Sequence, residues 1–186
     1  MNCFENTYYD HVYANSKEYA KHYRDVVYYP VWKEIMDSLQ AGDRVLDIGC
    51  GPGHFGHMLM DGGIDQYVGI DFSAVAVMMA KKKMPTARII QASITDGVSY
   101  DDFMGYTVTA IEVLEHIEDD IALIKKLPKG KIIFSVPNYN SNNHYRAYAD
   151  EEFILDYYRQ VIEIDEVVKF EMSKTSFIYV CKGKII

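Results

Sequence analysis

The chain has 186 residues, which is long enough to bury one α/β core and too short for two. Hydrophobic residues make up 49% and charged residues 25% of the chain, as in globular proteins, and no apolar run approaches the length of a membrane span. A formal net charge of -8 without a stripe of lysine and arginine argues against a nucleic-acid partner.

The amino terminus and the cysteines indicate where the protein resides. The first residues lack the basic and apolar regions of a signal peptide. Cys3, Cys50 and Cys181 are scattered and show no paired metal-ligand spacing, which favours free thiols in a reducing compartment. We therefore expect a cytoplasmic protein without a membrane partner.

The first thirty residues are rich in tyrosine. Tyr19 and Tyr23 are four positions apart, a spacing that predicts one face of a helix. Pro30 is a good first-turn residue, and the apolar spacing that follows predicts a helix as far as Leu39. The turn at 41–43 contains Gly42 and would end that helix.

From residue 44 onward, predicted strands alternate with predicted helices. Strands are expected at 44–48, 67–71, 88–91, 107–111 and 131–136, and helices at 54–60, 73–83 and 119–126. This alternation predicts parallel strands joined by right-handed crossovers and covered on both faces. A helix at 151–158 then precedes strands at 161–170 and 176–181, which read as an antiparallel hairpin. Lys81, Lys82 and Lys83 are interpreted as the solvated end of a helix.

The strongest motif is the string VLDIGCGPG at 45–53. Glycines directly after a strand allow a sharp turn and a close approach of the backbone to a ligand. Asp71 ends the next predicted strand, where a carboxylate can accept hydrogen bonds from two ribose hydroxyls. The pattern is G-x-G-x-G and not G-x-G-x-x-G, so a dehydrogenase is disfavoured.

These two strings resemble the first two motifs of the class I S-adenosylmethionine-dependent methyltransferases. The resemblance implies a single Rossmann-like, doubly wound α/β domain over 1–186, with a mostly parallel seven-stranded sheet and an antiparallel C-terminal hairpin. It implies S-adenosylmethionine as cofactor. Gly49, Gly51 and Gly53 would line its methionine end, with Asp47 orienting the loop. Asp71 would hold the ribose, and Phe72 would pack on the adenine. The residues implied in cofactor binding are Asp47, Gly49, Cys50, Gly51, Gly53, Asp71, Phe72, Ser93, Ile94 and Glu112.

Two of these assignments depart from the family pattern or have an alternative. Ser93 stands where the family commonly has Asp; its hydroxyl can still accept a hydrogen bond from the adenine amine, and the Ile94 backbone can serve the ring edge. Phe72 can equally belong to the core. By the same resemblance residues 1–30 form a lid, with Tyr9 and Tyr29 as candidate cofactor contacts, because aromatic faces stabilise a sulfonium cation. Alternatively, these tyrosines simply cover the open end of the sheet.

A second cluster, EVLEH at 112–116, follows the fourth predicted strand. It resembles the branch that contains the ubiquinone-biosynthesis O-methyltransferases and the small-RNA 3′-end 2′-O-methyltransferases, and it lacks the N/D-P-P-Y/F loop of enzymes that methylate nitrogen. Oxygen is therefore the favoured acceptor atom. His144 lies in a segment that resembles the same branch.

Two roles remain open for this cluster. By the resemblance, Glu112, Glu115, His116 and His144 match the four ligands of a divalent cation, and carboxylates with imidazoles suit Mg²⁺ or Mn²⁺. Alternatively, His144 and His116 are the catalytic residues: His144 accepts a hydroxyl proton as general base, and His116 lines the acceptor pocket or acts as base. His116 can also be an interior, hydrogen-bonded histidine. His11, His22, His54 and His57 are not expected to be catalytic.

Three functions follow. The leading hypothesis is O-methylation of a small molecule such as a sugar, a nucleotide-sugar or a natural product. The alternatives are a metal-dependent 2′-O-methyltransferase of RNA 3′ ends and an S-adenosylmethionine-binding partner protein without activity.

Overall fold

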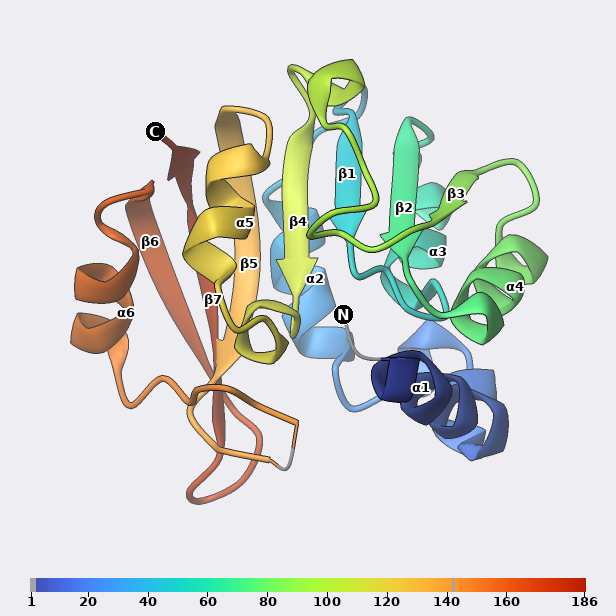
Figure 1. Ribbon diagram of the computed structural model, residues 1–186, viewed down its shortest axis with the longest axis horizontal. Coiled ribbons are helices and arrows are strands. Elements are labelled where there is room, and N and C mark those ends of the chain that lie inside the picture. Colours follow the sequence, from blue (N-terminus) through green and yellow to red (C-terminus); the bar gives the residue numbers. More distant parts are fainter. Residues whose placement is uncertain (1–2, 142) are drawn as a thin grey trace. The chain divides into compact units, whose positions relative to one another are not determined.

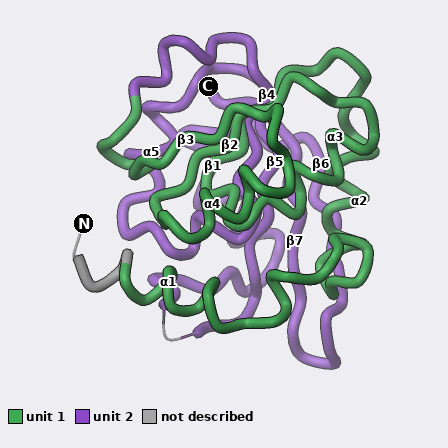
Figure 2. Tube along the Cα trace, turned by 90° about the vertical axis from the view of Figure 1, so that its right-hand side faces the viewer, with its two compact units in different colours: residues 1–98 green, residues 99–186 purple. Residues whose placement is uncertain are grey.

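The computed structural model describes residues 3–141 and 143–186, without the side chains of residues 3–6. The chain folds into two compact units, Met1–Val98 and Ser99–Ile186 (Figure 2). Cys50 and Cys181 are buried free thiols, as expected, and the Cys3 side chain lies outside the described part. Among the residues described, no helix has the length and apolar character needed to cross a membrane.

The first unit begins with short helices. These are α1 (Cys3–Asn15), the 3-10 helices η1 (Lys17–Ala20) and η2 (Tyr23–Asp25), and α2 (Tyr29–Asp37). Pro30 lies in the first turn of α2, as predicted. The expectation that Tyr19 and Tyr23 share a helix face is wrong, because Lys21 and His22 are extended and separate the two short helices.

A parallel sheet with helical crossovers follows in the same unit (Figure 1). Its strands are β1 (Val45–Ile48), β2 (Tyr67–Asp71) and β3 (Arg88–Gln91), in the order β3-β2-β1, and its crossover helices are α3 (His54–Asp61) and α4 (Ala74–Lys83). All residues of β1 and β2 are buried, as expected for strands covered on both faces. Ile48 pairs with Ile70 and Asp71 with Gln91, so the carboxyl ends of the three strands lie side by side. We refer to these carboxyl ends as one edge of the sheet.

The second unit contains a mixed sheet of order β4-β5-β7-β6. Its elements are η3 (Asp101–Phe103), β4 (Thr107–Ile111), η4 (Leu114–His116), α5 (Asp120–Lys126), β5 (Gly130–Pro137), α6 (Glu151–Tyr158), β6 (Ile162–Glu171) and β7 (Phe177–Ile185). Strands β4 and β5 are parallel, and β7 pairs antiparallel with both β5 and β6. The register shifts between Ile164 and Glu166, which marks a β-bulge.

The strands agree with the sequence prediction in order and type. Across the described residues there are three in the first unit and four in the second, mostly parallel and with an antiparallel hairpin at the carboxyl end. The last strand runs to Ile185, beyond the predicted end at 181, because its pairing with β5 and β6 continues to that residue. The α/β fold class is therefore confirmed. A single domain over 1–186 stays a prediction.

Candidate functional site

The loop between β1 and α3, residues 49–53, depends on its glycines. Gly49, Gly51 and Gly53 have φ angles of 70°, 52° and 78°, in the left-handed region that other L-residues avoid. The backbone N–H groups of Gly49 and Cys50 donate to the carbonyl oxygen of Ile70 at 2.8 and 3.0 Å. The loop is thus curled back onto the end of β2. We refer to residues 49–53 as the glycine loop.

Two of these glycines face different surroundings. A Cβ atom on Gly53 would lie 2.9 Å from the Cβ atom and 3.1 Å from the Cα atom of Ala80, so this glycine is required for packing against α4. A Cβ atom on Gly51 would meet only the Tyr13 hydroxyl, at 3.6 Å, among the described residues. The backbone at Gly51 is therefore open on the side where a ligand can approach it.

Asp71 lies beside the glycine loop. Its Oδ2 accepts from the Gly51 N–H at 2.8 Å, and its Oδ1 accepts from the Ser73 N–H at 2.8 Å. Burial raises the pKa of Asp71 to about 6, although these amide hydrogen bonds act in the opposite direction. Asp47, at the end of β1, is buried and accepts from the Tyr67 hydroxyl at 2.6 Å. The two acids therefore lie at the carboxyl ends of adjacent strands.

The predicted adenine-side residues occupy the neighbouring strand ends. Phe72 follows β2 directly and is half-buried; the Ala92 N–H, after β3, donates to the Asp71 carbonyl at 3.0 Å. The Ser93 hydroxyl forms a 2.9 Å hydrogen bond with that of Thr95, and Ile94 is buried. These side chains thus belong to the same edge as the glycine loop.

The tyrosine-rich segment contacts that edge through α1. Asp10 accepts hydrogen bonds from the Ser73 hydroxyl and, at 3.2 Å, from the Val75 N–H, so it adds to the N-terminal cap of α4. Tyr9 packs edge-to-face on Phe72, with ring centroids 5.5 Å apart. Tyr29 instead stacks on Tyr23 at 6.3 Å. Helix α1 therefore covers the glycine-loop edge, as a lid would.

In the second unit, Glu112 follows β4 in a strained conformation. Among the residues described it is the one non-glycine residue with positive φ, at 53°. The Ser135 hydroxyl accepts from the Glu112 N–H at 3.0 Å and donates to its carboxylate at 2.9 Å. Burial raises the pKa of Glu112 to about 7. Such strain is concentrated at functional sites in proteins.

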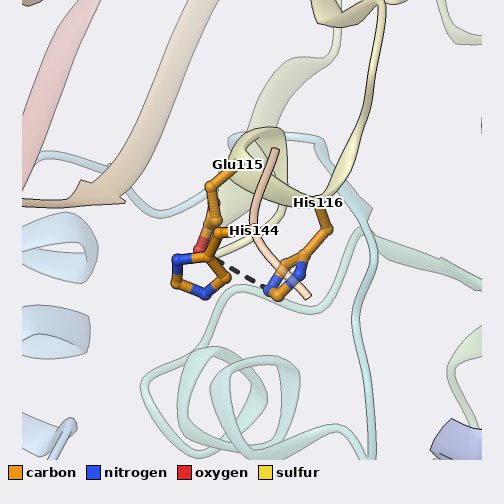
Figure 3. Close-up of side chains that lie close together, drawn as sticks. All are labelled: Glu115, His116 and His144. Atoms are coloured by element: carbon orange, nitrogen blue, oxygen red, sulfur yellow. Dashed lines mark ion pairs between the residues drawn. The ribbon is translucent and has the colours of Figure 1, made fainter. Parts of the chain in front are cut away.

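Glu115, His116 and His144 form a compact cluster (Figure 3). One ligating atom of each lies within 4.8 Å of those of the others, and His116 Nε2 lies 3.7 Å from Glu115 Oε1. Helix η4 supplies the first two residues, and the loop after β5 supplies His144. Three of the four predicted metal ligands are thus brought together, whereas the Glu112 carboxylate is hydrogen-bonded to Ser135.

Backbone carbonyls fix both imidazoles. His116 Nδ1 lies 2.9 Å from the Asn143 carbonyl oxygen, and His144 Nδ1 lies 3.2 Å from that of Tyr139. Because a carbonyl oxygen can only accept, each Nδ1 carries the proton and each Nε2 carries the lone pair. Burial lowers the pKa of both imidazoles, so both are neutral near pH 7.

The Glu115 carboxyl group is buried, and the hydrogen bonds within the described part of the chain do not satisfy both of its oxygens. Its side chain is 1% exposed, and Oε2 is the buried side-chain polar atom that lacks a hydrogen-bond partner within the described part of the chain. Burial raises the pKa of Glu115 well above its usual range, and the charge of Glu112 raises it further. A carboxylate oxygen beside two imidazole nitrogens is a donor set of the kind that suits a divalent cation.

An arginine that the sequence did not mark as functional, Arg146, holds this cluster in place. Arg146 donates to the carbonyl oxygens of Leu114, the first residue of η4, and of Ile117 and Glu118, which follow η4, at 3.2, 2.9 and 2.7 Å. Arg146 is two residues beyond His144, so one side chain fixes both contributing segments. No local pattern marks it, because its partners are distant in sequence.

A parallel α/β unit with a glycine loop after its first strand and an acid at the end of the next is typical of nucleoside-binding proteins. A family model described as a methyltransferase domain matches residues 20–164, so the chain belongs to this family. The resemblance of its sequence motifs to the class I S-adenosylmethionine-dependent methyltransferase family is thereby confirmed. The S-adenosylmethionine prediction is thereby confirmed.

Several curated relatives are ubiquinone biosynthesis O-methyltransferases. The chain is 28% identical over 125 residues to the ubiquinone biosynthesis O-methyltransferase of Nitrosospira multiformis, covering 62% of this chain and 52% of the relative. It is 30% identical over 124 residues to the enzyme of that name from Vibrio vulnificus, covering 61% and 52%. The chain thus spans about half the length of the curated relatives it matches.

Solved structures show the same fold. A protein from Pyrococcus horikoshii OT3 is similar with a TM-score of 0.74 and 16% identity, covering 95% of this chain and 99% of the other. Magnesium protoporphyrin IX methyltransferase from Synechocystis PCC 6803, with bound S-adenosylmethionine, is similar with a TM-score of 0.64 and 16% identity, covering 84% and 79%.

Proposed function

We propose that this chain transfers the methyl group of S-adenosylmethionine to a hydroxyl oxygen of a small molecule. The observation that carries the proposal is His144, whose Nδ1 is bonded to the Tyr139 carbonyl and whose ring is neutral near pH 7. Its Nε2 lone pair is therefore available to accept a proton. The names of the curated relatives, which are O-methyltransferases, support the choice of oxygen.

The cofactor would be held by residues of the first unit. Gly51 is open on one side and would receive the methionine end, and the Asp71 carboxylate would accept the ribose hydroxyls in a bidentate manner. Phe72, Ser93 and Ile94 would serve the adenine. Helix α1 covers this edge and would exclude water. The remaining residues of this set, Asp47, Gly49, Cys50 and Gly53, would shape the loop.

The reaction requires little covalent work from the protein. A bond forms between the acceptor oxygen and the methyl carbon while the carbon–sulfur bond breaks; the sulfur keeps that electron pair, and the hydroxyl proton passes to His144 Nε2. Most of the acceleration comes from alignment of the reacting atoms. General-base catalysis contributes about 100-fold or more.

An acceptor panel tests this proposal. Formation of S-adenosylhomocysteine would be measured with a catechol, a simple phenol, a hexose and a nucleotide-sugar as probes. We expect turnover with at least one hydroxyl compound and a loss of about 100-fold in kcat for His144→Gln. His57→Gln is the matched control, because His57 is a half-buried histidine outside the cluster. Methylation only of amines or thiols, or equal activity of both variants, would contradict the proposal.

A second candidate is the metal-dependent 2′-O-methylation of an RNA 3′ end. The unpartnered Oε2 of Glu115 next to His116 and His144 favours it. Glu115, His116 and His144 would hold the cation, with Glu112 as a fourth ligand after release from Ser135. Bound there, Mg²⁺ or Mn²⁺ would orient a vicinal diol and lower its proton affinity. The net charge of -8 weighs against an RNA substrate.

Manganese binding separates the two candidates. Electron paramagnetic resonance would count the Mn²⁺ bound to the wild type, to His144→Gln and to His57→Gln. If the metal-dependent candidate is right, the wild type and His57→Gln should each bind one Mn²⁺ per chain, and His144→Gln should bind it more weakly. A chelator should then abolish the activity. Full activity in the presence of the chelator would leave His144 as a metal-free base.

A further inference from the structure

Lys83 ends α4 and differs from the two lysines before it. All three were expected in solvent, but only Lys81 and Lys82 are exposed; Lys83 is half-buried. Its Nζ donates to the Pro52 carbonyl at 2.9 Å and to the Tyr19 carbonyl at 3.0 Å. Pro52 lies within the glycine loop, and Tyr19 lies in η1. One ammonium group thus joins two segments of the chain.

The hydrogen-bond partners of the Lys83 ammonium in the described part of the chain carry no negative charge. Besides the two carbonyl oxygens, its Nζ lies 3.3 Å from His54 Nε2. Burial, followed by the charge of Lys83, lowers the pKa of His54 to about 4, so this imidazole is neutral. Burial also lowers the pKa of Lys83 to about 8. Partial burial of an ammonium group costs desolvation free energy, and the hydrogen bonds that Lys83 donates to carbonyl oxygens offset this cost.

The segment that Lys83 holds is the one that covers the glycine loop. We define residues 7–28 as the amino-terminal segment. Its Tyr13 hydroxyl lies 3.6 Å from the position of a Cβ atom on Gly51, and its Lys21 carbonyl lies 3.0 Å from His54 Nε2. Without Lys83, the loop and the segment would lose their shared anchor.

We propose that Lys83 is a positioning residue that couples the glycine loop to the amino-terminal segment, so that the nucleoside cofactor binds a loop already set for it. Lys83 acts through the Pro52 and Tyr19 carbonyls and does not need to contact the cofactor. The inference depends on cofactor binding at the glycine loop and is independent of the acceptor. It therefore survives if the proposed O-methylation fails.

Trp32 provides a direct readout, because it is the only tryptophan of the chain. It is 9% exposed and stacks on His54 with ring centroids 5.7 Å apart and an interplanar angle of 15°. His54 follows the glycine loop directly and touches Lys83. Binding of S-adenosylhomocysteine is therefore expected to change the fluorescence of Trp32 in the wild type.

The test uses S-adenosylhomocysteine as the probe, so no acceptor is required. Calorimetry and Trp32 fluorescence would be recorded for the wild type, Lys83→Met, Lys83→Gln and Lys83→Arg, with Lys82→Met as the exposed control. We expect the Kd to rise about tenfold or more in Lys83→Met and Lys83→Gln, because each loses charged hydrogen bonds. Lys83→Arg should recover part of the affinity, and Lys82→Met should match the wild type.

Limited proteolysis supplies the second measurement. Chymotrypsin cleavage near Tyr19 should be slowed by S-adenosylhomocysteine in the wild type and much less in Lys83→Met at a saturating probe concentration. Near-wild-type Kd and cleavage in both Lys83→Met and Lys83→Gln would overturn the proposal. It would also be overturned if Lys82→Met weakened binding as strongly as they do, or if Lys83→Arg bound no better than Lys83→Met.

Discussion

Asp120 and Arg146 form a buried ion pair in which Nη1 of the arginine lies 3.1 Å from Oδ2 of the aspartate. The Asp120 side chain has no exposed surface, and the hydroxyls of Tyr157 and Tyr158 donate to it at 2.8 and 2.7 Å. The aspartate thus holds Arg146 in place, and Arg146 holds the carbonyls around η4. The geometry of the Glu115, His116 and His144 cluster depends on this pair.

Replacing Arg146 by Met should therefore damage both stability and activity. The substitution leaves the Asp120 carboxylate buried without its cation, which costs about 3 kcal/mol in the free energy of unfolding. Arg159→Met is the control, because its pair with Asp156 is 77% and 70% exposed and should contribute about 1 kcal/mol at most. Urea denaturation gives both values. A small cost for Arg146→Met, equal to that of Arg159→Met, would refute this account.

Gly51→Ala should separate binding from folding. The positive φ of Gly51 makes alanine cost about 1 kcal/mol, and Gly42→Ala, at φ 96° with no atom near its Cβ position, should cost a similar amount. Of these two variants, only Gly51→Ala should weaken S-adenosylhomocysteine binding, by about tenfold, or about 1.4 kcal/mol. Gly53→Ala should destabilise more than either, because its Cβ atom meets Ala80. Denaturation and calorimetry on all three variants test this order.

The Asp71 carboxylate should make cofactor binding pH-dependent. Burial raises its pKa to about 6, and ribose hydroxyls donate to its ionised form. Affinity for S-adenosylhomocysteine should be constant above pH 7 and fall on acidification, approaching about tenfold per pH unit below pH 6. Asp71→Asn should bind weakly with little dependence on pH. Equal affinities of the wild type at pH 5 and pH 7.5 would exclude this role.

Glu115 should destabilise the ligand-free protein as the pH rises. Its folded-state pKa is raised above the ordinary 4.5, so the folded state binds more protons than the unfolded state above pH 4.5. Stability from this group is then present at low pH and lost as the pH increases through the folded pKa. Glu115→Gln should be more stable than the wild type at pH 8, on the order of 1 kcal/mol, with a smaller gain at pH 5. The exposed Glu171→Gln should show no such trend in thermal melts.

The sequence indicated the arrangement around the glycine loop because the residues that form it lie in consecutive elements of the chain. Gly49, Gly51 and Gly53 follow one strand, Asp71 ends the next, and register alone brings them to one edge. It did not reveal Arg146, whose contacts depend on how η4 meets a distant loop. The sequence predicted Lys83 to be solvated, because nothing in a run of three lysines indicates which side chain points toward the protein interior.

The hydrogen bond between Asp10 and Ser73 lies beyond such prediction for the same reason. The two residues are far apart in the chain, and no periodic pattern joins them. Tyr19 and Tyr23 show the converse error, since helical spacing was present but the intervening backbone is extended. Tertiary contacts decided both cases.

The left-handed backbone of Glu112 has a consequence for protein engineering. Glycine would relax this position, so a laboratory selection for heat resistance alone would enrich Glu112→Gly. Recovery of glycine in such a selection would show that the natural glutamate lowers the thermal stability of the protein in exchange for a carboxylate at this position.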